Sequence, residues 1–342
     1  MGFGVGPHEL IAKRGFFQLA RAERHFIPGQ IWHITHRCHK REFLSKFALD
    51  RNIINASNAK GLNRRMNTVN ESHDHPCALV TGATSGIGAA FADRLAQKGF
   101  DLILHGRRQK ELMERAKNLE RTYRTSVEII IAELSRTEEM KKVEERIESL
   151  DRLDMLINNA GYWEPGAFWE RSPGSLESMI MVHAIAPVRF IRAALPHMLA
   201  RHKGDIINVS SMGAYFNMAT LENYGATKAY VLSFTESLHV ALMGTGIRVQ
   251  ALAPGFTVTE FHSRLGADLT KYQRRWMQPE EVVDKSLRAL EKGRVLCIPG
   301  VRRRLLVKLV SALPRPVYYK LMEAIGEKVK KRWDEIGKTL AK

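Results

Sequence analysis

The alternation of apolar strands with amphipathic helices between Pro76 and about Pro299 constrains the fold more than any other feature. Helical patterns of ten or more residues, such as 140–150 and 175–200, separate short apolar runs. Strands that are apolar along their whole length are buried on both faces, which predicts a parallel sheet covered by helices on both sides. We therefore expect a doubly wound α/β domain. The predicted strands are 78–80, 102–104, 127–131, 155–157, 206–209 and 249–252.

Charge divides the 342 residues into three predicted segments, with a net charge of +17 overall. The central segment, 76–300, carries 29 basic and 26 acidic side chains, as a soluble enzyme domain would. The excess lies in an N-terminal extension, 1–75, expected to be irregular, and in a helical C-terminal extension, 301–342. A basic total alone favours nucleic acid, which binds with a steep salt dependence, but the neutral centre argues against it as the main partner.

The three cysteines, Cys38, Cys77 and Cys297, are far apart and predict no disulfide framework. The sequence has no run of about 18 apolar residues, as a membrane span requires, and no apolar block typical of a secretory signal. We therefore expect a cytoplasmic protein, with contact at a membrane surface as an alternative.

A glycine-rich segment, residues 81–88, directly follows the first predicted strand and leads into a helix. Glycines in such a turn let backbone N–H groups and the helix N-terminus approach a pyrophosphate, whose charge the helix dipole favours. Its spacing is TGxxxGxG and differs from the GxGxxG dinucleotide fingerprint. The predicted cofactor-binding residues here are Gly82, Thr84, Ser85, Gly86, Ile87 and Gly88.

Two arginines, Arg107 and Arg108, follow the second predicted strand, about 20 residues beyond the glycines. An acidic side chain at this place would accept the ribose hydroxyls of NAD, and none is present. A guanidinium can instead pair with a 2'-phosphate through two parallel hydrogen bonds. The sequence therefore favours NADP(H) over NAD(H), the alternative being two solvated arginines at a helix start.

Tyr224 and Lys228 are four residues apart in a predicted helix and so share one face. A phenol with a pKa near 10 is a poor acid or base at neutral pH, and a neighbouring ammonium lowers that pKa. A tyrosine so placed can exchange a proton with a carbonyl or alcohol oxygen. Ser211 follows the fifth predicted strand, at the edge where open α/β sheets bind ligands, and its hydroxyl can bond the same oxygen.

In these motifs the sequence resembles the short-chain dehydrogenase/reductase family, in its compact subgroup, over about residues 76–300. The resemblance implies a Rossmann-type fold and an NADP(H)-dependent oxidoreductase, with Tyr224 as general acid/base, Ser211 orienting the substrate oxygen and Lys228 holding the nicotinamide ribose. It also implies a homodimer or tetramer paired through 175–201 and 222–244. Further cofactor-binding residues that it implies are Asn158, Asn159, Ala160, Gly161, Pro254, Gly255, Thr257 and Thr259.

Two positions depart from the family pattern. His183 stands where the family often has an asparagine whose backbone holds a water that passes protons to the lysine. We expect either a simple replacement or a titrating member of the relay. Glu133, followed by Leu134, stands where aspartate is usual beside the adenine, and we expect its longer carboxylate to reach the same N–H partner.

The residues that follow the motifs are aromatic and methionine-rich with little charge, which indicates a hydrophobic ketone, aldehyde or secondary alcohol as substrate. An alternative for each of them is packing in the core. A rival function, suggested by His183, is a regulatory protein that binds the cofactor without turnover. The expected lining consists of Tyr162, Trp163, Phe168, Trp169, Met212, Tyr215, Phe216, Met218, Phe256, Phe261 and Leu265.

The C-terminal extension contains two basic amphipathic helical patterns, 302–313 and 317–338. Such helices can cap a substrate pocket, cover the edge of an oligomer or lie on anionic lipid. We favour the cap, with peripheral membrane contact through 301–342 as the alternative.

The N-terminal extension lies outside the family resemblance. Residues 33–39 hold three histidines and one cysteine, yet donors so close together without a second cluster seldom form a closed metal site, so no metal is expected. Residues 26–37 weakly resemble the opening strand of transposases associated with repetitive palindromic elements. A fusion remnant is one interpretation, with Met66 as the natural start.

Overall fold

The computed structural model describes residues 75–164, 166–260 and 276–340, with side chains described as far as Glu327. The chain divides into two compact units, 1–70 and 71–342, and every described residue belongs to the second. The expectations for residues 1–74, including the irregular extension, the 33–39 cluster and the transposase-like segment, therefore lie outside the described residues. So do Phe261 and Leu265.

A seven-stranded parallel sheet forms the centre of the described unit, with the order β3-β2-β1-β4-β5-β6-β7. The order reverses at β1 and β4, which creates the switch point where open α/β sheets bind ligands. The predicted doubly wound parallel sheet is thus confirmed. Its strands are β1 (Cys77–Thr81), β2 (Asp101–Gly106), β3 (Val127–Ile131), β4 (Met155–Asn158), β5 (Gly204–Val209), β6 (Ile247–Leu252) and β7 (Leu296–Cys297).

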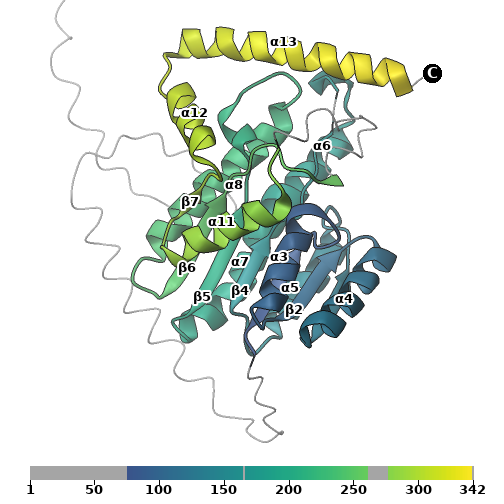
Figure 1. Ribbon diagram of the computed structural model, residues 1–342, viewed down its shortest axis with the longest axis vertical. Coiled ribbons are helices and arrows are strands. Elements are labelled where there is room, and N and C mark those ends of the chain that lie inside the picture. The colour runs from purple at the N-terminus through teal and green to yellow at the C-terminus, as the bar shows by residue number, and fades with distance from the viewer. Residues whose placement is uncertain (1–74, 165, 261–275, 341–342) are drawn as a thin grey trace, which may run out of the picture. The chain divides into compact units, whose positions relative to one another are not determined.

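Helices cover both faces of the sheet, because its strands carry apolar side chains on each side. The first apolar core unites one face with α3 (Gly86–Gln97), α4 (Gln109–Tyr123) and α11 (Pro279–Glu291). The second core unites the other face with α5 (Thr137–Glu148), α7 (Ala186–Ala200) and α8 (Glu222–Ala241). Figure 1 shows α3 and α11 in front of the strands.

One continuous helical stretch, from 173 to 200, changes its geometry in the middle. It consists of α6 (Pro173–Ile180), a π-helical segment η2 (Met181–Ile185) and α7. Its length and composition would suit a membrane span, but 56% of its most apolar window is buried, and α7 packs on α5 and on β4 and β5. These contacts are those of a core helix.

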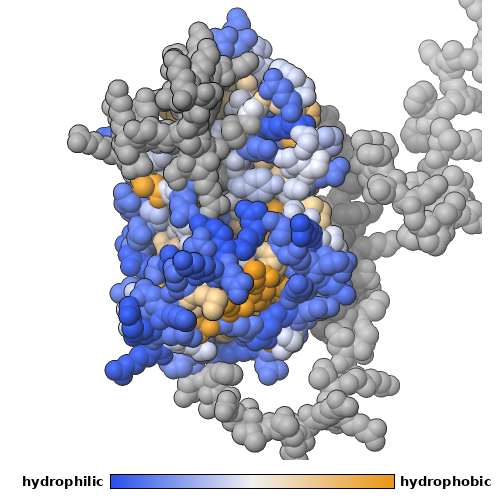
Figure 2. All heavy atoms as spheres, turned by 90° about the vertical axis from the view of Figure 1, so that its right-hand side faces the viewer, coloured by the Kyte–Doolittle hydropathy of each residue, from blue (hydrophilic) through white to orange (hydrophobic). Residues whose placement is uncertain are grey.

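The β3 edge of the sheet is partly open to solvent. Every residue of β3 is partly exposed, since β2 pairs with it on one side only. Figure 2 faces this side of the molecule and shows an apolar area framed by hydrophilic side chains.

Two helices follow β7 and cover the loop after β5. They are α12 (Val301–Ser311) and α13 (Arg315–Leu340), seen at the top of Figure 1. The inner residue Val310 packs with Tyr318 and Met322 against residues 216–218. The Tyr318 hydroxyl donates a hydrogen bond to the carbonyl oxygen of Tyr215 (3.0 Å) and accepts one from the backbone N–H of Asn217 (2.8 Å). The helical C-terminal extension is therefore docked on the segment that follows Ser211.

Candidate active site and cofactor cradle

The glycine-rich turn between β1 and α3 is too tight for side chains at its key positions. Gly86 has φ +58, in the left-handed region that favours glycine. A Cβ at Gly88 would lie 2.2 Å from the carbonyl oxygen of Gly82 and 2.4 Å from Nδ2 of Asn159. Helix α3 has no acidic residue in its first turn, so its N-terminus keeps the positive end of its dipole.

The 158–161 segment after β4 holds this turn from the side. The Asn159 side-chain amide donates to the carbonyl oxygens of Thr81 (2.9 Å) and Gly82 (3.1 Å). In return, the Thr81 hydroxyl oxygen accepts from the backbone N–H groups of Asn159 (2.9 Å) and Ala160 (3.0 Å). Thr81 and Asn159 thus lock β1, β4 and the turn into one shape.

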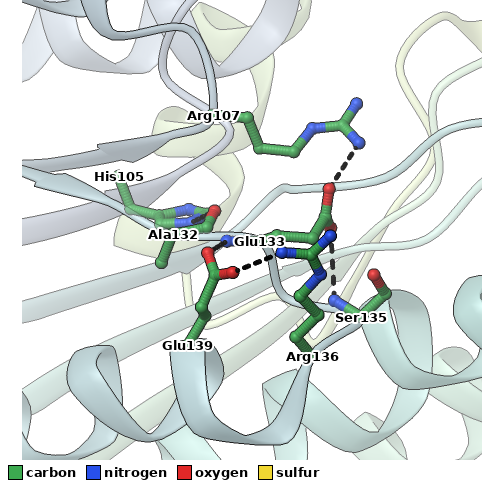
Figure 3. Close-up of polar contacts among 7 residues, drawn as sticks. All are labelled: His105, Arg107, Ala132, Glu133, Ser135, Arg136 and Glu139. Carbon is green, nitrogen blue, oxygen red and sulfur yellow. Dashed lines mark hydrogen bonds and ion pairs between the residues drawn. The ribbon is translucent and has the colours of Figure 1, made fainter.

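His105, on β2, supports the turn from below. Its Nε2 donates to the carbonyl oxygen of Ala132 (3.0 Å), which leaves Nδ1 to accept from the backbone N–H of Gly82 (3.4 Å). Burial lowers the pKa of His105 to about 4, so the ring is neutral at physiological pH. Figure 3 shows His105 beside Ala132 at the end of the strands.

Arg107 is already engaged by a carboxylate. Its guanidinium pairs with Glu133 at 2.8 Å, and the other Glu133 oxygen accepts from the backbone N–H of Ser135 (3.2 Å) (Figure 3). These bonds lower the pKa of Glu133 in spite of partial burial, which raises it. The Glu133 carboxylate therefore takes its partners from the protein, and the adjacent Leu134 is buried in the core.

Arg108 lies over the glycine-rich turn. Its guanidinium donates to the hydroxyls of Thr84 (3.0 Å) and Ser85 (3.2 Å) and pairs with Glu260 (2.9 Å) and Glu111 (3.3 Å). A guanidinium and two hydroxyls that converge in this way are donors suited to a phosphate group. Arg107 and Arg108, for which the sequence predicts the same role, therefore have different surroundings.

These features fit a dinucleotide. The close-packed turn formed by Gly82, Gly86 and Gly88 leads into the α3 N-terminus, which is where a pyrophosphate would bind, and Arg108 stands beside it. At the far end, a Cβ at Gly86 would lie 2.9 Å from Thr259, so the turn directly faces the loop after β6. In that loop the Thr257 hydroxyl donates to the carbonyl oxygen of Gly255 (3.0 Å).

Ser211, Tyr224 and Lys228 converge at the carboxyl end of β5. Ser211 begins the short helix η3 (Met212–Tyr215), and its hydroxyl accepts from the backbone N–H of Gly213 (3.0 Å). A hydrogen bond links the side chains of Ser211 and Tyr224. Lys228, one turn along α8, has its ammonium 5.9 Å from the centre of the Tyr224 ring and donates to the carbonyl oxygen of Val209 (2.9 Å).

The charge states of this group differ in part from the sequence expectation. Burial raises the pKa of Tyr224, and the hydrogen bond from Ser211 offsets only part of that shift. Burial also lowers the pKa of Lys228 to about 8. The net shift is upward because desolvation dominates, while the Lys228 ammonium points to the carbonyl oxygen of Val209. Tyr224 is therefore a protonated phenol at neutral pH. A lowering of the Tyr224 pKa by Lys228 stays a prediction.

His183 is fixed as a neutral ring on the π-helical segment. Its Nε2 accepts from the backbone N–H of Tyr162 (3.0 Å), and its Nδ1 bonds the Thr227 hydroxyl (2.9 Å). The Thr227 hydroxyl donates in turn to the carbonyl oxygen of Tyr224 (2.8 Å), so Nδ1 must carry the proton. Burial and the nearby Lys228 hold the pKa of His183 well below its ordinary value. Both ring nitrogens are engaged within the protein.

Gly161 separates His183 from Lys228. A Cβ at Gly161 would lie 3.0 Å from Nε2 of His183 and 3.3 Å from Nζ of Lys228. Gly161 therefore allows His183 and Lys228 to pack closely beside Tyr224, whereas Asn159 fixes the glycine-rich turn. The Asn158 amide is buried and donates to Asn208 (2.8 Å).

The residues of the expected aromatic lining have different surroundings. Met212, Tyr215 and Phe216 pack with the inner side of α12, and Phe256 stacks on Trp276 with ring centres 5.4 Å apart. Tyr162 contacts His183 edge to face, and the Trp163 indole donates to the carbonyl oxygen of Thr220 (2.9 Å). The other expected residues that the structure describes are Met218, packed near α13, and the exposed Phe168 and Trp169.

Three residues near the site were not predicted from the sequence: Thr227, Tyr318 and Arg303. Thr227 lies inside the YxxxK motif and links His183 to Tyr224, a contact that only the packing of α8 on η2 reveals. Tyr318 and Arg303 belong to the C-terminal extension, whose basic and amphipathic pattern showed a helix but not which side chains face inward.

Comparisons with known proteins agree with this geometry. A family model described as "short chain dehydrogenase" matches residues 76–270. An uncharacterized oxidoreductase of Staphylococcus saprophyticus is 34% identical over 216 residues, which is 63% of this chain and 91% of that protein. A short-chain dehydrogenase from Sphingobium yanoikuyae, solved in complex with NADPH, is 33% identical, with a TM-score of 0.64 over 70% of this chain and 96% of that one.

A second solved relative is the bulky-bulky ketone specific alcohol dehydrogenase from Comamonas testosteroni. It is 30% identical, with a TM-score of 0.61 over 70% of this chain and 95% of that one. The matched family model spans strands β1 to β6, the glycine-rich turn and the Ser211, Tyr224 and Lys228 group together. The chain therefore belongs to the short-chain dehydrogenase family of oxidoreductases, which act on alcohol and carbonyl groups with a nicotinamide cofactor.

Proposed function

We propose that the protein is an NADP(H)-dependent oxidoreductase that interconverts a hydrophobic ketone or aldehyde and the corresponding alcohol. The observation that carries the proposal is the convergence of Ser211, Tyr224 and Lys228 at the end of β5, beside the glycine-rich turn of the switch point. The bound nicotinamide supplies or accepts the hydride.

In the reductive direction, Tyr224 donates its phenolic proton to the carbonyl oxygen as the carbonyl carbon receives hydride. Its raised pKa keeps the phenol protonated at neutral pH, which is the form that a general acid needs. Ser211 hydrogen-bonds the same oxygen and fixes its position. The Lys228 ammonium adds positive charge close to the phenolate that remains.

The substrate class follows from the surroundings of η3. Met212, Tyr215 and Phe216 form an apolar cluster with α12, and Phe256 is 62% exposed beyond it. Such a lining favours a substrate with a bulky apolar body. The Comamonas relative, described as specific for bulky-bulky ketones, supports the same class.

A panel of aliphatic, aromatic and polycyclic ketones, assayed by NADPH oxidation, tests this function. We expect turnover with bulky apolar ketones and little with small polar ones. A protein that binds NADPH but oxidises it with no member of the panel would instead support the rival regulatory role.

We also propose that NADP(H) is preferred because Arg108 and the hydroxyls of Thr84 and Ser85 form a phosphate site. We assign Arg107 a smaller share. Both arginines pair with carboxylates, but of the two it is Arg108 that also contacts the hydroxyls of the glycine-rich turn. The NADPH complex of the Sphingobium relative supports the use of NADP(H) as the cofactor.

His183→Asn is expected to leave the pH dependence of carbonyl reduction unchanged. Burial and the nearby Lys228 hold the pKa of His183 well below its ordinary value, and both ring nitrogens have partners inside the protein, so the ring should not titrate near neutral pH. Reductive kcat/KM should be level at lower pH and fall as the pH rises through about 8, where Lys228 loses its charge. A profile measured with a pH-independent carbonyl substrate checks this.

The wild-type protein is the control for that profile. An apparent pKa near the ordinary value for histidine, about 6.5, that disappears in His183→Asn would show His183 to be a titrating relay member. A lower rate with an unchanged profile would fit a positioning role through Thr227 and the Tyr224 backbone.

Leu199→Glu is expected to break a homodimer or tetramer, which we propose forms through α7 and α8. An apolar groove runs along these helices, and a carboxylate placed in it would be desolvated by a partner subunit. Light scattering after size exclusion should show a smaller species than the wild type. Met113→Glu, at an exposed methionine of α4, is the control. A wild-type monomer would contradict the proposal. The groove is lined by Val188, Ile191, Arg192, Leu195, Pro196, Leu199, Phe234 and Leu238.

A further inference from the structure

Arg303 is the inward-facing arginine of the basic triplet that opens α12. Arg302 and Arg304 are exposed, whereas Arg303 is partly buried. Its side chain lies over Gly255, where a Cβ would be 3.0 Å from Arg303 Nε and 2.9 Å from Met212 Sδ. The Arg303 guanidinium therefore stands at the end of β6, next to the residue that follows Ser211.

The 211–213 segment connects this guanidinium to the reacting hydroxyls. Met212 touches the same face of Gly255 as Arg303, and its backbone N–H donates to the carbonyl oxygen of Pro254 (2.9 Å). One residue further on, a Cβ at Gly213 would lie 3.2 Å from the Tyr224 ring and 3.3 Å from Ser211 Oγ. A ligand that lies along this segment can reach the two hydroxyls and Arg303 together.

The charge of Arg303 is poorly compensated by the residues that the structure describes. Its hydrogen bond to the carbonyl oxygen of Phe256 is long, at 3.4 Å, and none of the described carboxylates forms an ion pair with it. Burial lowers the pKa of Arg303, and only the distant charge of Glu281 opposes this. A partly desolvated cation without an anion is costly, and an incoming carboxylate would offset that cost.

The surroundings of Arg303 are otherwise apolar. Val307, one turn further along α12, packs with Ile298 and Ala253 and with the side chains of Tyr215 and Phe216. A guanidinium at the margin of such a cluster suits a ligand with an apolar body and one anionic group. The planar fork of arginine matches a carboxylate through two parallel hydrogen bonds, which gives geometric selectivity as well as affinity.

We propose that Arg303 is a specificity-determining residue that binds a carboxylate on the substrate whose carbonyl oxygen meets Ser211 and Tyr224. The inference rests on the proposed function and narrows its substrate class to apolar oxo acids and the corresponding hydroxy acids. Within the triplet 302–304, Arg303 then faces the site and binds substrate, whereas Arg302 and Arg304 face solvent.

A matched set of substrates and variants tests the proposal. The substrates are a graded series of medium- and long-chain oxoalkanoates and their methyl esters, and the variants are Arg303→Met and the exposed control Arg302→Met. For the best acid, Arg303→Met should lower kcat/KM by about 10- to 100-fold, as expected for one charged hydrogen-bonded pair. The ester should be reduced equally well by all three proteins, and Arg302→Met should behave as the wild type.

Two binding measurements complete the test. Calorimetry with the best acid and NADPH-loaded protein should show binding that Arg303→Met weakens by a similar factor, whether or not turnover occurs. NADPH affinity, followed by its fluorescence, should be unchanged; a loss there would mean that Arg303 binds a cofactor phosphate and would overturn the proposal. Equal losses for acid and ester, or a wild type that does not prefer the acid, would also overturn it. Binding of the acid without reduction of any ketone would instead count against the proposed function.

Discussion

Tyr224→Phe is expected to lower kcat for carbonyl reduction by about 10²- to 10⁴-fold, the usual share of a general acid. The substitution removes the phenolic hydroxyl that is bonded to Ser211 and leaves the ring, which His183 contacts edge to face at 5.7 Å between centres. The packing of α8 should therefore survive. NADPH binding should also survive, because the glycine-rich turn is untouched. Steady-state oxidation of NADPH and fluorescence titration measure the two effects separately.

Tyr230→Phe is the matched control for that experiment. Tyr230 lies on the same helix, is 47% exposed and stacks on Phe234, so the loss of its hydroxyl should not affect the rate. Equal activity of Tyr224→Phe and the wild type would show that another group protonates the substrate. A loss of NADPH binding in Tyr224→Phe would point to structural damage.

Most of the sheet could be predicted from the sequence because its strands are buried on both faces. β1 and β2 appear as apolar runs, the prediction for β3 matches its observed bounds, and the other predicted strands differ from the observed ones by at most two residues at an end. β7 contains only Leu296 and Cys297 and leaves no pattern. The π-helical segment could not be predicted from the sequence either. One extra residue per turn within 173–200 does not disturb an apolar helical pattern.

The site could be predicted where its chemistry lies in one short segment. The glycine-rich turn depends on local backbone geometry, and the Tyr224 and Lys228 pair depends on the helical repeat. The charge states could not be predicted, because they depend on burial and on partners from other elements. Glu133 captures Arg107 across two neighbouring strands, a pairing that requires the observed strand order.

The position of Arg303 in the C-terminal extension could not be predicted from the sequence either. The triplet 302–304 is a charged run in the sequence, and only the direction of α12 decides which arginine faces inward. The sequence therefore showed a basic helix without showing that one of its cations approaches Gly255.

Arg108→Met is expected to lower the preference for NADPH over NADH by about 100-fold, measured as the ratio of the two kcat/KM values. One charged hydrogen-bonded contact accounts for about 10- to 100-fold, and Arg108 stands with two hydroxyls at the same point. The loss should fall almost wholly on NADPH, since NADH has no 2'-phosphate to lose. KM for the cofactor should rise while the reaction at Tyr224 is preserved.

Arg107→Met is the internal comparison, because it removes the same charge one residue away. A phosphate would have to compete with Glu133 at Arg107, as it would with Glu111 and Glu260 at Arg108. Of the two arginines, it is Arg108 that also contacts the Thr84 and Ser85 hydroxyls. The selectivity ratio should therefore change less than in Arg108→Met. Removing the competing carboxylate should have the opposite effect. Glu133→Gln frees Arg107, and the affinity for NADPH should rise. If Arg107→Met instead costs as much selectivity as Arg108→Met, both arginines hold the phosphate and the pairing with Glu133 breaks when the cofactor binds.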